Sequence, residues 1–424
     1  MADATPFLRG LRGATILGIN PPVFDFTFFD LWAKPLGLLF LLDALRRRGN
    51  TVHLLDCIAE GSGEQLSFGR RKLLRREISK PAPFRNIPRR YHRFGLDDAE
   101  ILLRLHALPR PDCIMVTSGM TYWYEGVFRA VELAKEVFPG VPVLLGGVYA
   151  RLCPEHAGRS GADIVQDILP DIPFVRPAME LYSEPGYALL LTSFGCPLSC
   201  EYCASKLLFP QFIERDLSET LADAAFQFSL DGVHDAAFYD DALLIDKERR
   251  FYPLCEELVR RFPGVRYHTP NGLHIREIDE RCAAVLKQTG FQTLRLSLES
   301  SDPAFQRKGS GKTSGEELQH ALRNLQKAGF APEQMETYIL AGLPGQTTVS
   351  VEASIRFVES CGARAKLAEF SPVPGTPSFE EAASILPELR SEPLLHNKTV
   401  YSSFLSGNIS PEKLQFLKDL TKHR

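Results

Sequence analysis

The 424-residue sequence contains no long uninterrupted apolar segment. Its longest apolar stretch, from Pro35 to Leu45, is interrupted by Asp43 and is too short to cross a bilayer. The first residues also lack the basic, apolar and small-residue succession of a secretory signal peptide. We therefore expect a protein that has no membrane span and is located in the cytoplasm.

The sequence also has little excess of one charge sign, because 49 Lys and Arg residues stand against 52 Asp and Glu residues. A formal charge of −3 argues against a surface that binds nucleic acids generally. Cysteine is scarce, and an odd number of nine without an export signal favours reduced thiols over a disulfide framework. The apolar fraction of 44% is ordinary for globular proteins, and the length allows two or three domains.

No Gly-x-Gly-x-x-Gly fingerprint follows the first predicted strand, so a nicotinamide-binding role is not expected. Residues 1–168 instead alternate apolar strands with helical patterns, which predicts a Rossmann-like parallel sheet covered on both faces. The strand candidates are ATILGINPP, TVHLLDC, CIMVTSG, VPVLLGGVY and GADIVQD. An insertion at 62–110 is too long for a simple loop, which indicates a functional or self-structured segment.

A second series of strands and helices covers residues 185–377. Its strand candidates are YALLLTSFG, DAAFYDDA, VRYHTPNGL, TLRLSLES, METYILAGLPG and AKLAEFSPVPGT, and its helices are expected at 219–230, 247–262, 279–289, 315–328 and 350–361. Six consecutive βα units predict a partial (β/α)6 barrel with an active site at the carboxyl ends of its strands. Residues 378–424 are expected to form a short helical C-terminal cap.

Three of the nine cysteines, Cys196, Cys200 and Cys203, stand within eight residues just after the first barrel strand. Closely spaced thiolates bind soft metals and iron–sulfur clusters, and three ligands leave one iron of a cubane open. Zinc is the competing metal, but zinc modules usually add a second nearby ligand pair, and the next cysteine is Cys255. We favour a [4Fe–4S] cluster with an open iron over zinc or inert buried thiols.

The Cys-x-x-x-Cys-x-x-Cys motif and its barrel, about Tyr187 to Pro377, resemble the radical SAM superfamily. In that family the open iron binds the amino and carboxylate groups of S-adenosylmethionine (SAM). Reduction of the cluster, by an external donor such as flavodoxin or ferredoxin, then cleaves SAM to a 5′-deoxyadenosyl radical. The resemblance implies that Tyr202, the aromatic residue before the last cysteine, lies beside the adenine.

Other predicted strand ends carry residues at positions where that family binds SAM. Asp240 and Asp241 end the second strand, where the family contacts the methionyl ammonium, a group that needs acceptors. The further SAM candidates are Ser297 and Glu299 at the fourth strand, Asn271 at the third, and Gly342 of AGLPG, where backbone can approach the adenine. The alternatives are that Asp241 only caps a helix and that Asn271 only stabilises a turn.

The first domain resembles the cobalamin-binding domain that precedes the barrel in one branch of the superfamily. That domain has a Ser-x-Leu element and a Gly-Gly element about two dozen residues later. Ser118 with Met120, and Gly146 with Gly147, match them, with methionine in place of leucine. Paired glycines and a small hydroxyl at strand ends predict a cleft for a nucleotide tail.

The third element of that domain, Asp-x-His-x-x-Gly, keeps Asp56 and Gly61 but has Ile58 where the cobalt-ligating histidine is expected. The resemblance therefore implies cobalamin without a histidine lower ligand. An Ile58→His variant is expected to add a nitrogen ligand to the cobalt. The alternative is a domain that has lost the cofactor and only docks on the barrel.

The leading function is cobalamin-dependent methylation of an unactivated carbon, with a rearrangement, cyclisation or oxidation as the alternative within radical SAM enzymes. A methylthiotransferase needs a second cluster, for which Cys57, Cys113 and Cys153 are the nominees, but Cys113 begins its strand and belongs at the opposite sheet edge. A non-catalytic cofactor sensor is the remaining class. His396 and Asn397 are the only substrate-facing candidates in the cap, and they are equally consistent with anchoring the tail.

The insertion contains a strongly basic stretch, Arg70 to Arg93, with ten basic residues and a single acid, Glu77. A phosphate or RNA site is one reading, with Tyr91 and His92 available to stack on bases. We favour the other, a solvated loop that pairs its arginines with carboxylates of the barrel. The sequence does not identify the substrate beyond a small molecule.

Overall fold

The computed structural model describes residues 4–60, 62–166, 175–309 and 313–422, which form two compact units. The first unit comprises Met1–Pro185 and Glu388–His396, and the second comprises Gly186–Pro387 and Asn397–Arg424. Within the described part of the chain, no helix is both long and apolar enough to span a membrane. Gly61, part of the cobalamin-type pattern, lies outside the described residues.

The first unit contains a five-stranded sheet with the order β10-β9-β8-β1-β3, in which all pairs are parallel. Its strands are β1 (Thr15–Asn20), β3 (Thr51–Asp56), β8 (Cys113–Val116), β9 (Val143–Leu145) and β10 (Ile164–Val165). Because β1 lies between β3 and β8, the direction of winding reverses there, and doubly wound sheets bind ligands at the carboxyl ends beside such a point. The predicted Rossmann-like sheet is confirmed.

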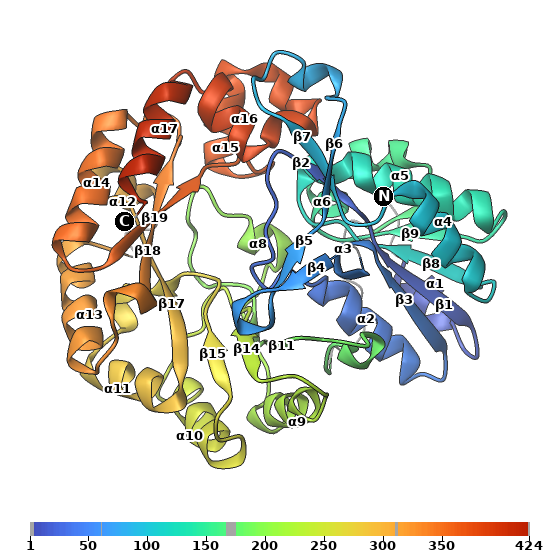
Figure 1. The fold of residues 1–424 in the computed structure, drawn as a ribbon, viewed down its shortest axis with the longest axis horizontal. Helices are drawn as coiled ribbons and strands as arrows, with labels where there is room; N and C mark the ends of the chain where they lie inside the picture. The colour runs from blue at the N-terminus through green and yellow to red at the C-terminus, as the bar shows by residue number, and fades with distance from the viewer. Residues whose placement is uncertain (1–3, 61, 167–174, 310–312, 423–424) are drawn as a thin grey trace. The chain divides into compact units, whose positions relative to one another are not determined.

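Helices cover both faces of this sheet (Figure 1). The helix α2 (Leu36–Arg46) shares a buried cluster with Ile16 and Met115, whereas α4 (Asp98–Ala107) and α5 (Tyr124–Val137) share one with Leu17 and Ile114. Successive strand residues point to opposite faces, so an apolar residue is needed at each position. This two-sided burial explains why the strands are near-continuously apolar.

The insertion is folded rather than a solvated loop. Strands β4 (Ser62–Gln65) and β5 (Arg71–Leu73) form one antiparallel pair, and β6 (Arg75–Ile78) and β7 (Tyr91–Phe94) join β2 (Val23–Asp25) in a three-stranded sheet. Ion pairs between its arginines and carboxylates of the same unit are Arg71–Glu184, Arg76–Asp97, Arg90–Glu77 and Arg93–Asp98. The basic residues therefore help to stabilise the first unit internally.

The second unit is built on a sheet with the order β11-β14-β15-β17-β18-β19, again with parallel pairs throughout, and β16 adds to β17. The strands are β11 (Ala188–Leu190), β14 (Asp235–Phe238), β15 (Arg266–His268), β16 (Leu273–His274), β17 (Phe291–Glu299), β18 (Met335–Ala341) and β19 (Arg364–Glu369). This is the expected partial barrel. Its strand ends meet at one rim.

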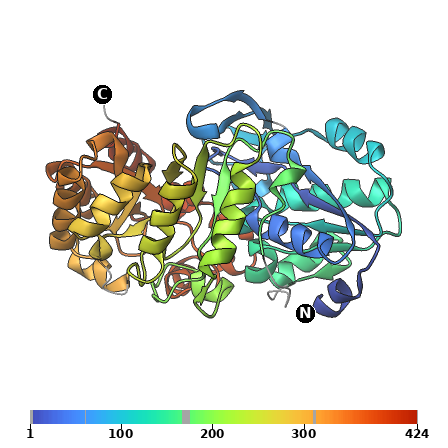
Figure 2. The ribbon, with the colours of Figure 1, turned by 90° about the horizontal axis from the view of Figure 1, so that it is seen from below.

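Helices follow the barrel strands and lie on the outer side of the sheet (Figures 1 and 2). They are α9 (Leu217–Phe228), α10 (Phe251–Arg261), α11 (Glu280–Thr289), α13 (Gly315–Lys327) and α14 (Thr348–Ser360). In α13, residues Leu318, Ala321, Leu322 and Leu325 are buried, which is the spacing of one helix face. The Ser314 hydroxyl accepts a hydrogen bond from the Glu317 amide at 3.2 Å and begins this helix.

The region expected to form one C-terminal cap is divided between the units. Residues 388–396 belong to the first unit, whereas α15 (Pro377–Ile385), the π-helical turn Tyr401–Leu405 and α17 (Pro411–Leu420) belong to the second. His396 is buried, with its ring nitrogens 2.9 Å from the Thr121 hydroxyl and 2.7 Å from the Leu389 carbonyl. His396 therefore anchors residues 388–396 within the first unit.

Asn397, the other substrate candidate of the cap, is also buried. Its side-chain oxygen accepts hydrogen bonds from the amides of Thr399 (2.9 Å) and Val400 (3.4 Å) and so caps the short helix α16 (Lys398–Val400). The cap residues serve local structure.

Candidate active site

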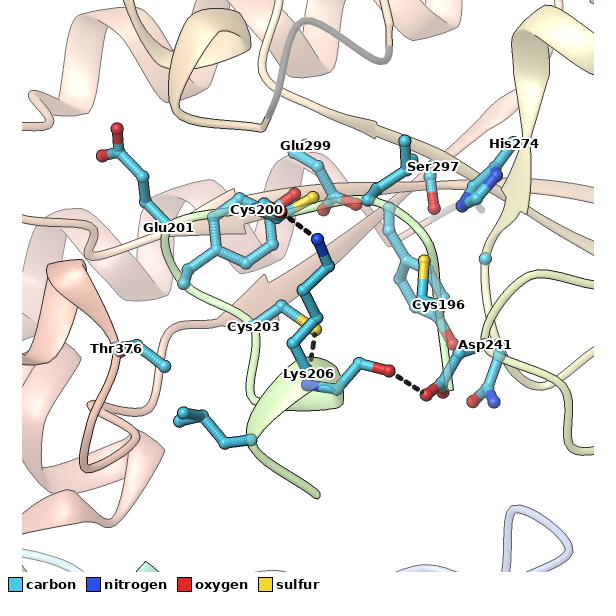
Figure 3. Close-up of a pocket in the computed structure, with 18 of the residues that line it drawn as sticks. Cys196, Cys200, Glu201, Cys203, Lys206, Asp241, His274, Ser297, Glu299 and Thr376 are labelled. Atoms are coloured by element: carbon cyan, nitrogen blue, oxygen red, sulfur yellow. Dashed lines mark hydrogen bonds between the residues drawn. The ribbon is translucent and has the colours of Figure 1, made fainter. Parts of the chain in front are cut away.

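A pocket of about 510 Å³ lies at the carboxyl end of the barrel strands in the second unit (Figure 3). Its walls combine the cysteine loop, strand ends of the barrel and the start of α15. Residues from the loop are Cys196, Cys200, Glu201, Tyr202, Cys203 and Lys206, and those from strand ends include Asp241, Asn271, His274, Ser297, Glu299 and Tyr338. The fold thus brings together residues that are more than 140 positions apart in the sequence.

The cysteine loop rises from a short antiparallel stem, in which β12 (Ser193–Phe194) pairs with β13 (Ile213–Glu214). The predicted first barrel strand therefore ends at Leu190, and the chain turns into this stem. Gly195 has a φ of +76°, and a Cβ there would lie 2.8 Å from the Gln211 carbonyl oxygen. Only glycine adopts this conformation at such close range without strain.

The loop is held at its tip as well as at its stem. The Glu201 amide donates to the Lys308 carbonyl at 2.9 Å, and the Glu201 carbonyl accepts from the Ser378 amide at 3.0 Å. The Cys200 thiol lies 3.5 Å from the Gly309 carbonyl, and the Cys203 sulfur accepts from the Ser205 amide at 3.4 Å. Backbone contacts on both sides therefore hold the cysteines at the pocket wall.

The three thiols suit an iron–sulfur cluster better than a single metal ion. All three line the same pocket, and Figure 3 shows Cys200 and Cys203 on the side of Lys206 and Cys196 on the side of Asp241. Among the described residues, no three His, Cys, Asp or Glu side chains form a single-ion site. A cubane places each thiolate on a different iron, so its ligands need not converge. Cys255, the next cysteine, is buried in the barrel core.

Glu299 ends β17 in a strained backbone conformation with a φ of +69°. The pairing of β17 with β18 is irregular between Ser297 and Glu299, as at a β-bulge. Bulges and left-handed non-glycine residues are concentrated where a side chain must be aimed at a functional site. Ser297 lines the same pocket, and a Cβ on Gly272 would lie 2.0 Å from its hydroxyl oxygen.

The two neighbouring aspartates have different environments. Asp241 lines the pocket and accepts a hydrogen bond from the Ser205 hydroxyl at 2.5 Å. Asp240 is 3% exposed and accepts hydrogen bonds from Thr192 and Ser193. Burial raises the pKa of Asp240, and these hydrogen bonds oppose that shift. The structure therefore brings Asp241, but not Asp240, to the pocket wall.

Asn271 and Tyr202 also reach the pocket. The Asn271 side-chain amide donates to the carbonyls of Tyr239 (2.9 Å) and Asp240 (3.3 Å), and these contacts stabilise the turn after β14. Burial, together with the nearby Glu299 and Cys200, raises the pKa of the Tyr202 phenol, which therefore stays neutral.

Gly342 does not line this pocket. It has a φ of +97°, and a Cβ there would lie 2.4 Å from the Ser402 hydroxyl oxygen. The Ser402 hydroxyl donates to the carbonyl of Phe370 at 2.8 Å, so the π-helical turn packs directly over the end of β18. The group that closely approaches the backbone at Gly342 is therefore the Ser402 side chain, where the sequence predicted the adenine of SAM.

The polar pocket residues that the sequence did not predict include His274, Lys206 and Tyr338. His274 is buried and stands opposite Ser297 in the pairing of β16 with β17. Lys206 donates to the Ser199 hydroxyl from within the cysteine loop. The Tyr338 hydroxyl donates to the Pro270 carbonyl at 3.1 Å. A strand register would have identified His274, but it is not readable from one sequence.

In the first unit, the cobalamin-type residues contact one another. The Ser118 hydroxyl donates to the Gly146 carbonyl at 2.7 Å. Gly147 has a φ of +95°, and a Cβ there would lie 2.4 Å from the Ser118 carbonyl oxygen. Met120 is 46% exposed. The Ser-x-Leu and Gly-Gly elements are thus brought together at adjacent strand ends, but their polar atoms bond to each other.

Asp56 and Ile58 are both engaged within the first unit. One Asp56 oxygen accepts from the side chain of Asn20 (2.8 Å) and the amide of Ile58 (3.0 Å), and the other accepts from the Tyr182 hydroxyl (2.6 Å). Ile58 is 6% exposed and packs with Val23 and Phe94. A histidine at position 58 would therefore enter a packed apolar cluster, and this burial argues against the expectation that it would reach a cofactor.

The cysteines nominated for a second cluster do not gather at one place. Cys113 begins β8, whereas Cys57 follows the carboxyl end of the parallel strand β3. Burial raises the pKa of the Cys113 and Cys153 thiols to about 12 each, and it raises that of Cys57 as well. Because Cys57 and Cys113 lie at opposite edges of the sheet, the three thiols do not form a shared cluster site.

Comparison with known proteins identifies the barrel. The model of the Radical SAM superfamily matches residues 190–358. An uncharacterized methyltransferase of Pyrococcus horikoshii (PH0819) is 26% identical over 213 residues, which are 48% of this chain and 44% of that protein. The chain spans about half the length of the curated relatives it matches first.

Two solved structures share the fold over most of this chain. TsrM, a radical S-adenosylmethionine methyltransferase from Kitasatospora setae, aligns with a TM-score of 0.63 and 16% identity, over 88% of this chain and 76% of TsrM. The cobalamin-dependent S-adenosylmethionine radical enzyme OxsB aligns with a TM-score of 0.58 and 13% identity, over 96% of this chain and 61% of OxsB. One TsrM structure contains cobalamin and a [4Fe–4S] cluster.

Proposed function

We propose that this protein, in which residues 190–358 are a radical SAM domain, methylates an unactivated carbon of a small molecule by cobalamin-dependent radical SAM chemistry. The observation that carries the proposal is the pocket that Cys196, Cys200 and Cys203 line together with Asp241 and Glu299. When bound, a reduced [4Fe–4S] cluster supplies the electron that cleaves SAM to a 5′-deoxyadenosyl radical, and cobalamin supplies the methyl group.

The pocket residues divide into ligands, acceptors and walls. The three thiolates would hold three irons of the cluster, and an external one-electron donor such as flavodoxin or ferredoxin would reduce it. The carboxylates of Asp241 and Glu299 offer acceptors, which the ammonium and the ribose hydroxyls of SAM require. Tyr202 and Tyr338 contribute aromatic side chains to the pocket wall.

The fold of the first unit supports the role of cobalamin. Asp56, Ser118 and Gly146 lie at or just after the carboxyl ends of β3, β8 and β9, parallel strands of one sheet in which the direction of winding reverses at β1. The fold resemblance to TsrM and OxsB, both solved with cobalamin bound, extends over this unit because their alignments cover 88% and 96% of the chain. Histidine is absent from position 58, so the cofactor would lack a histidine ligand from that position.

One observation favours a second candidate, a radical SAM rearrangement, cyclisation or oxidation without methyl transfer. The Ser118 hydroxyl bonds to the Gly146 carbonyl, and Gly147 packs on the Ser118 backbone. A nucleotide tail that entered between these elements would have to replace those contacts. If these contacts persist in the presence of a corrinoid, the first unit does not bind cobalamin and the reaction proceeds without this cofactor.

The test combines two measurements on anaerobically reconstituted protein. Incubation with SAM and dithionite should release 5′-deoxyadenosine, and incubation with hydroxocobalamin should leave a stoichiometric corrinoid on the protein after gel filtration. Release of 5′-deoxyadenosine without corrinoid binding would replace methylation by the second candidate. A filled cluster that cleaves no SAM would overturn radical catalysis and leave a cofactor sensor.

A further inference from the structure

The stem of the cysteine loop is attached to the barrel through one buried carboxylate. The Thr192 amide lies 3.0 Å from both Asp240 oxygens, and the Thr192 hydroxyl donates to Asp240 Oδ1 at 2.6 Å. The Ser193 hydroxyl donates to the same oxygen at 2.8 Å. Thr192 and Ser193 directly precede the loop that carries the three cysteines. Asp240 therefore accepts hydrogen bonds from the hydroxyls of both Thr192 and Ser193, the residues that lead into the stem.

Two buried arginines complete this attachment. Arg250 donates to the Thr192 hydroxyl oxygen at 2.9 Å and lies 3.7 Å from a Glu214 oxygen on the opposite strand of the stem. The Arg215 amide donates to the Thr192 carbonyl at 2.9 Å, and its guanidinium pairs with Asp223 at 3.2 Å, with both side chains almost fully buried. Both strands of the stem are thus tied to the same polar network.

We infer that Asp240 is a positioning residue, which orients the cysteine loop for cluster binding, whereas Asp241 beside it faces the ligand. The side chains of adjacent residues leave an extended chain in opposite directions, so one can point to the stem and the other to the pocket. Asp240 reaches both Thr192 and Ser193, whereas Asp241 lines the pocket. This inference rests on the proposed cluster at Cys196, Cys200 and Cys203.

Removal of one acceptor from this network leaves buried donors without partners. In Asp240→Asn, an amide group replaces one acceptor oxygen and the charge that faces Arg250 is lost. The stem then loses its fixed orientation, and the three thiols no longer keep one arrangement. Asp241→Asn has the same change in charge and shape, but it affects a side chain of the pocket wall.

The experiment compares these two variants after anaerobic reconstitution. Asp240→Asn should lose at least half of the iron per folded chain, and the remaining reduced cluster should show altered electron paramagnetic resonance g-values before SAM is added. Asp241→Asn should keep wild-type iron and wild-type g-values, and it should bind SAM at least tenfold more weakly. Circular dichroism gives the folded fraction for both variants.

A second pair of variants tests the stem from its other side and guards against misfolding of Asp240→Asn. Thr192→Val removes the hydroxyl that joins Asp240 to Arg250 and should also lower the iron content, whereas Thr192→Ser should restore it. Thr337→Val is the matched control, because Thr337 is also buried and its hydroxyl has no hydrogen-bond partner among the described residues. This control should keep wild-type iron.

The outcomes separate this inference from the proposed function. If wild-type protein takes up no iron and sulfide, both are overturned. If the wild type holds a cluster and Asp240→Asn matches it in iron and g-values but loses SAM binding, Asp240 is a cofactor contact and the inference alone is wrong. A lower melting temperature with unchanged iron and g-values would likewise reduce Asp240 to a general stability role.

Discussion

The strand ends of the second unit surround a pocket, whereas the motif residues at the strand ends of the first unit bond to one another. In the barrel, Glu299 and Asp241 line an open pocket beside three thiols. In the first unit, Ser118 bonds to Gly146, and Asp56 bonds to Asn20 and Tyr182. Both units are parallel sheets, so the location of a residue at a carboxyl end does not establish that it is available to a ligand.

The difference arises from what fills the space beyond the strands. In the second unit the cysteine loop rises from an antiparallel stem, and backbone contacts of Glu201 hold its tip. In the first unit, strands β6 and β7 of the insertion join β2 in a small antiparallel sheet, and Val23 and Phe94 of this sheet pack on Ile58. The second unit therefore has a pocket beside its cysteine loop, whereas the first unit has an apolar cluster around Ile58.

The largest expected effect is the loss of the cluster when its ligands are removed. The triple variant Cys196→Ala, Cys200→Ala, Cys203→Ala should contain no iron or labile sulfide after reconstitution, because thiolates are the ligands of such clusters. Cys153→Ala is the control from the first unit and should keep the wild-type content. A full cluster in the triple variant would show that other residues bind the metal. The pocket of the second unit would then no longer differ from the first unit in binding the cluster.

Acid should destabilise the first unit through the anchoring residue His396. Burial lowers the pKa of His396 from 6.5 to about 4. Below pH 6.5 the unfolded chain binds a proton at this histidine, whereas the folded chain binds it only near pH 4. The free energy of unfolding is therefore highest above pH 6.5 and falls as the pH approaches 4. The loss is up to about 3 kcal/mol.

Tryptophan fluorescence reports on this unit, because both tryptophans, Trp32 and Trp123, belong to it. Urea unfolding of the wild type and of His396→Gln at pH 8 and pH 5 should show a smaller pH dependence in the variant. An equal pH dependence in both proteins would show that His396 does not control the attachment of residues 388–396.

Removal of the Glu299 carboxylate should weaken SAM binding about ten- to hundredfold, the effect of losing one or two hydrogen bonds to a charged group. Glu299→Gly is the sharpest variant, since glycine accepts the φ of +69° without strain and keeps the backbone of β17. Iron content should be unchanged. Equilibrium dialysis with SAM measures the affinity, and a wild-type value in Glu299→Gly would remove Glu299 from the site.

The smallest expected effect comes from position 58 of the first unit and tests whether this position belongs to the apolar core or faces a cofactor. Ile58→His places a polar ring in the cluster of Val23 and Phe94 and should lower the free energy of unfolding by about 2 kcal/mol. Ile58→Val, the matched control, should cost about 1 kcal/mol. Cobalt(II) electron paramagnetic resonance of the corrinoid-loaded His variant should show no nitrogen splitting. A stable variant with splitting would establish that position 58 faces the cofactor.

The sequence by itself determined the strands of the two large parallel sheets, the helices between them and the chemistry of the cysteine loop, but not the strands of the insertion or of the stem. Near-continuous apolar strands separated by amphipathic helices allow only buried parallel sheets, because both faces of each strand must be covered. The spacing of Cys196, Cys200 and Cys203 is local, so their proximity follows from the chain alone. These features depend on residues close together in sequence.

Only the tertiary structure decided which strand-end residues line the pocket. Asp240 and Asp241 are adjacent and chemically identical, but Asp240 meets Thr192 and Ser193 from another strand, and Asp241 meets the pocket. Gly342 is covered by Ser402, which lies 60 residues later in the chain. The physical reason is that burial and hydrogen-bond partners come from distant segments, whose positions follow from the packing of the whole unit.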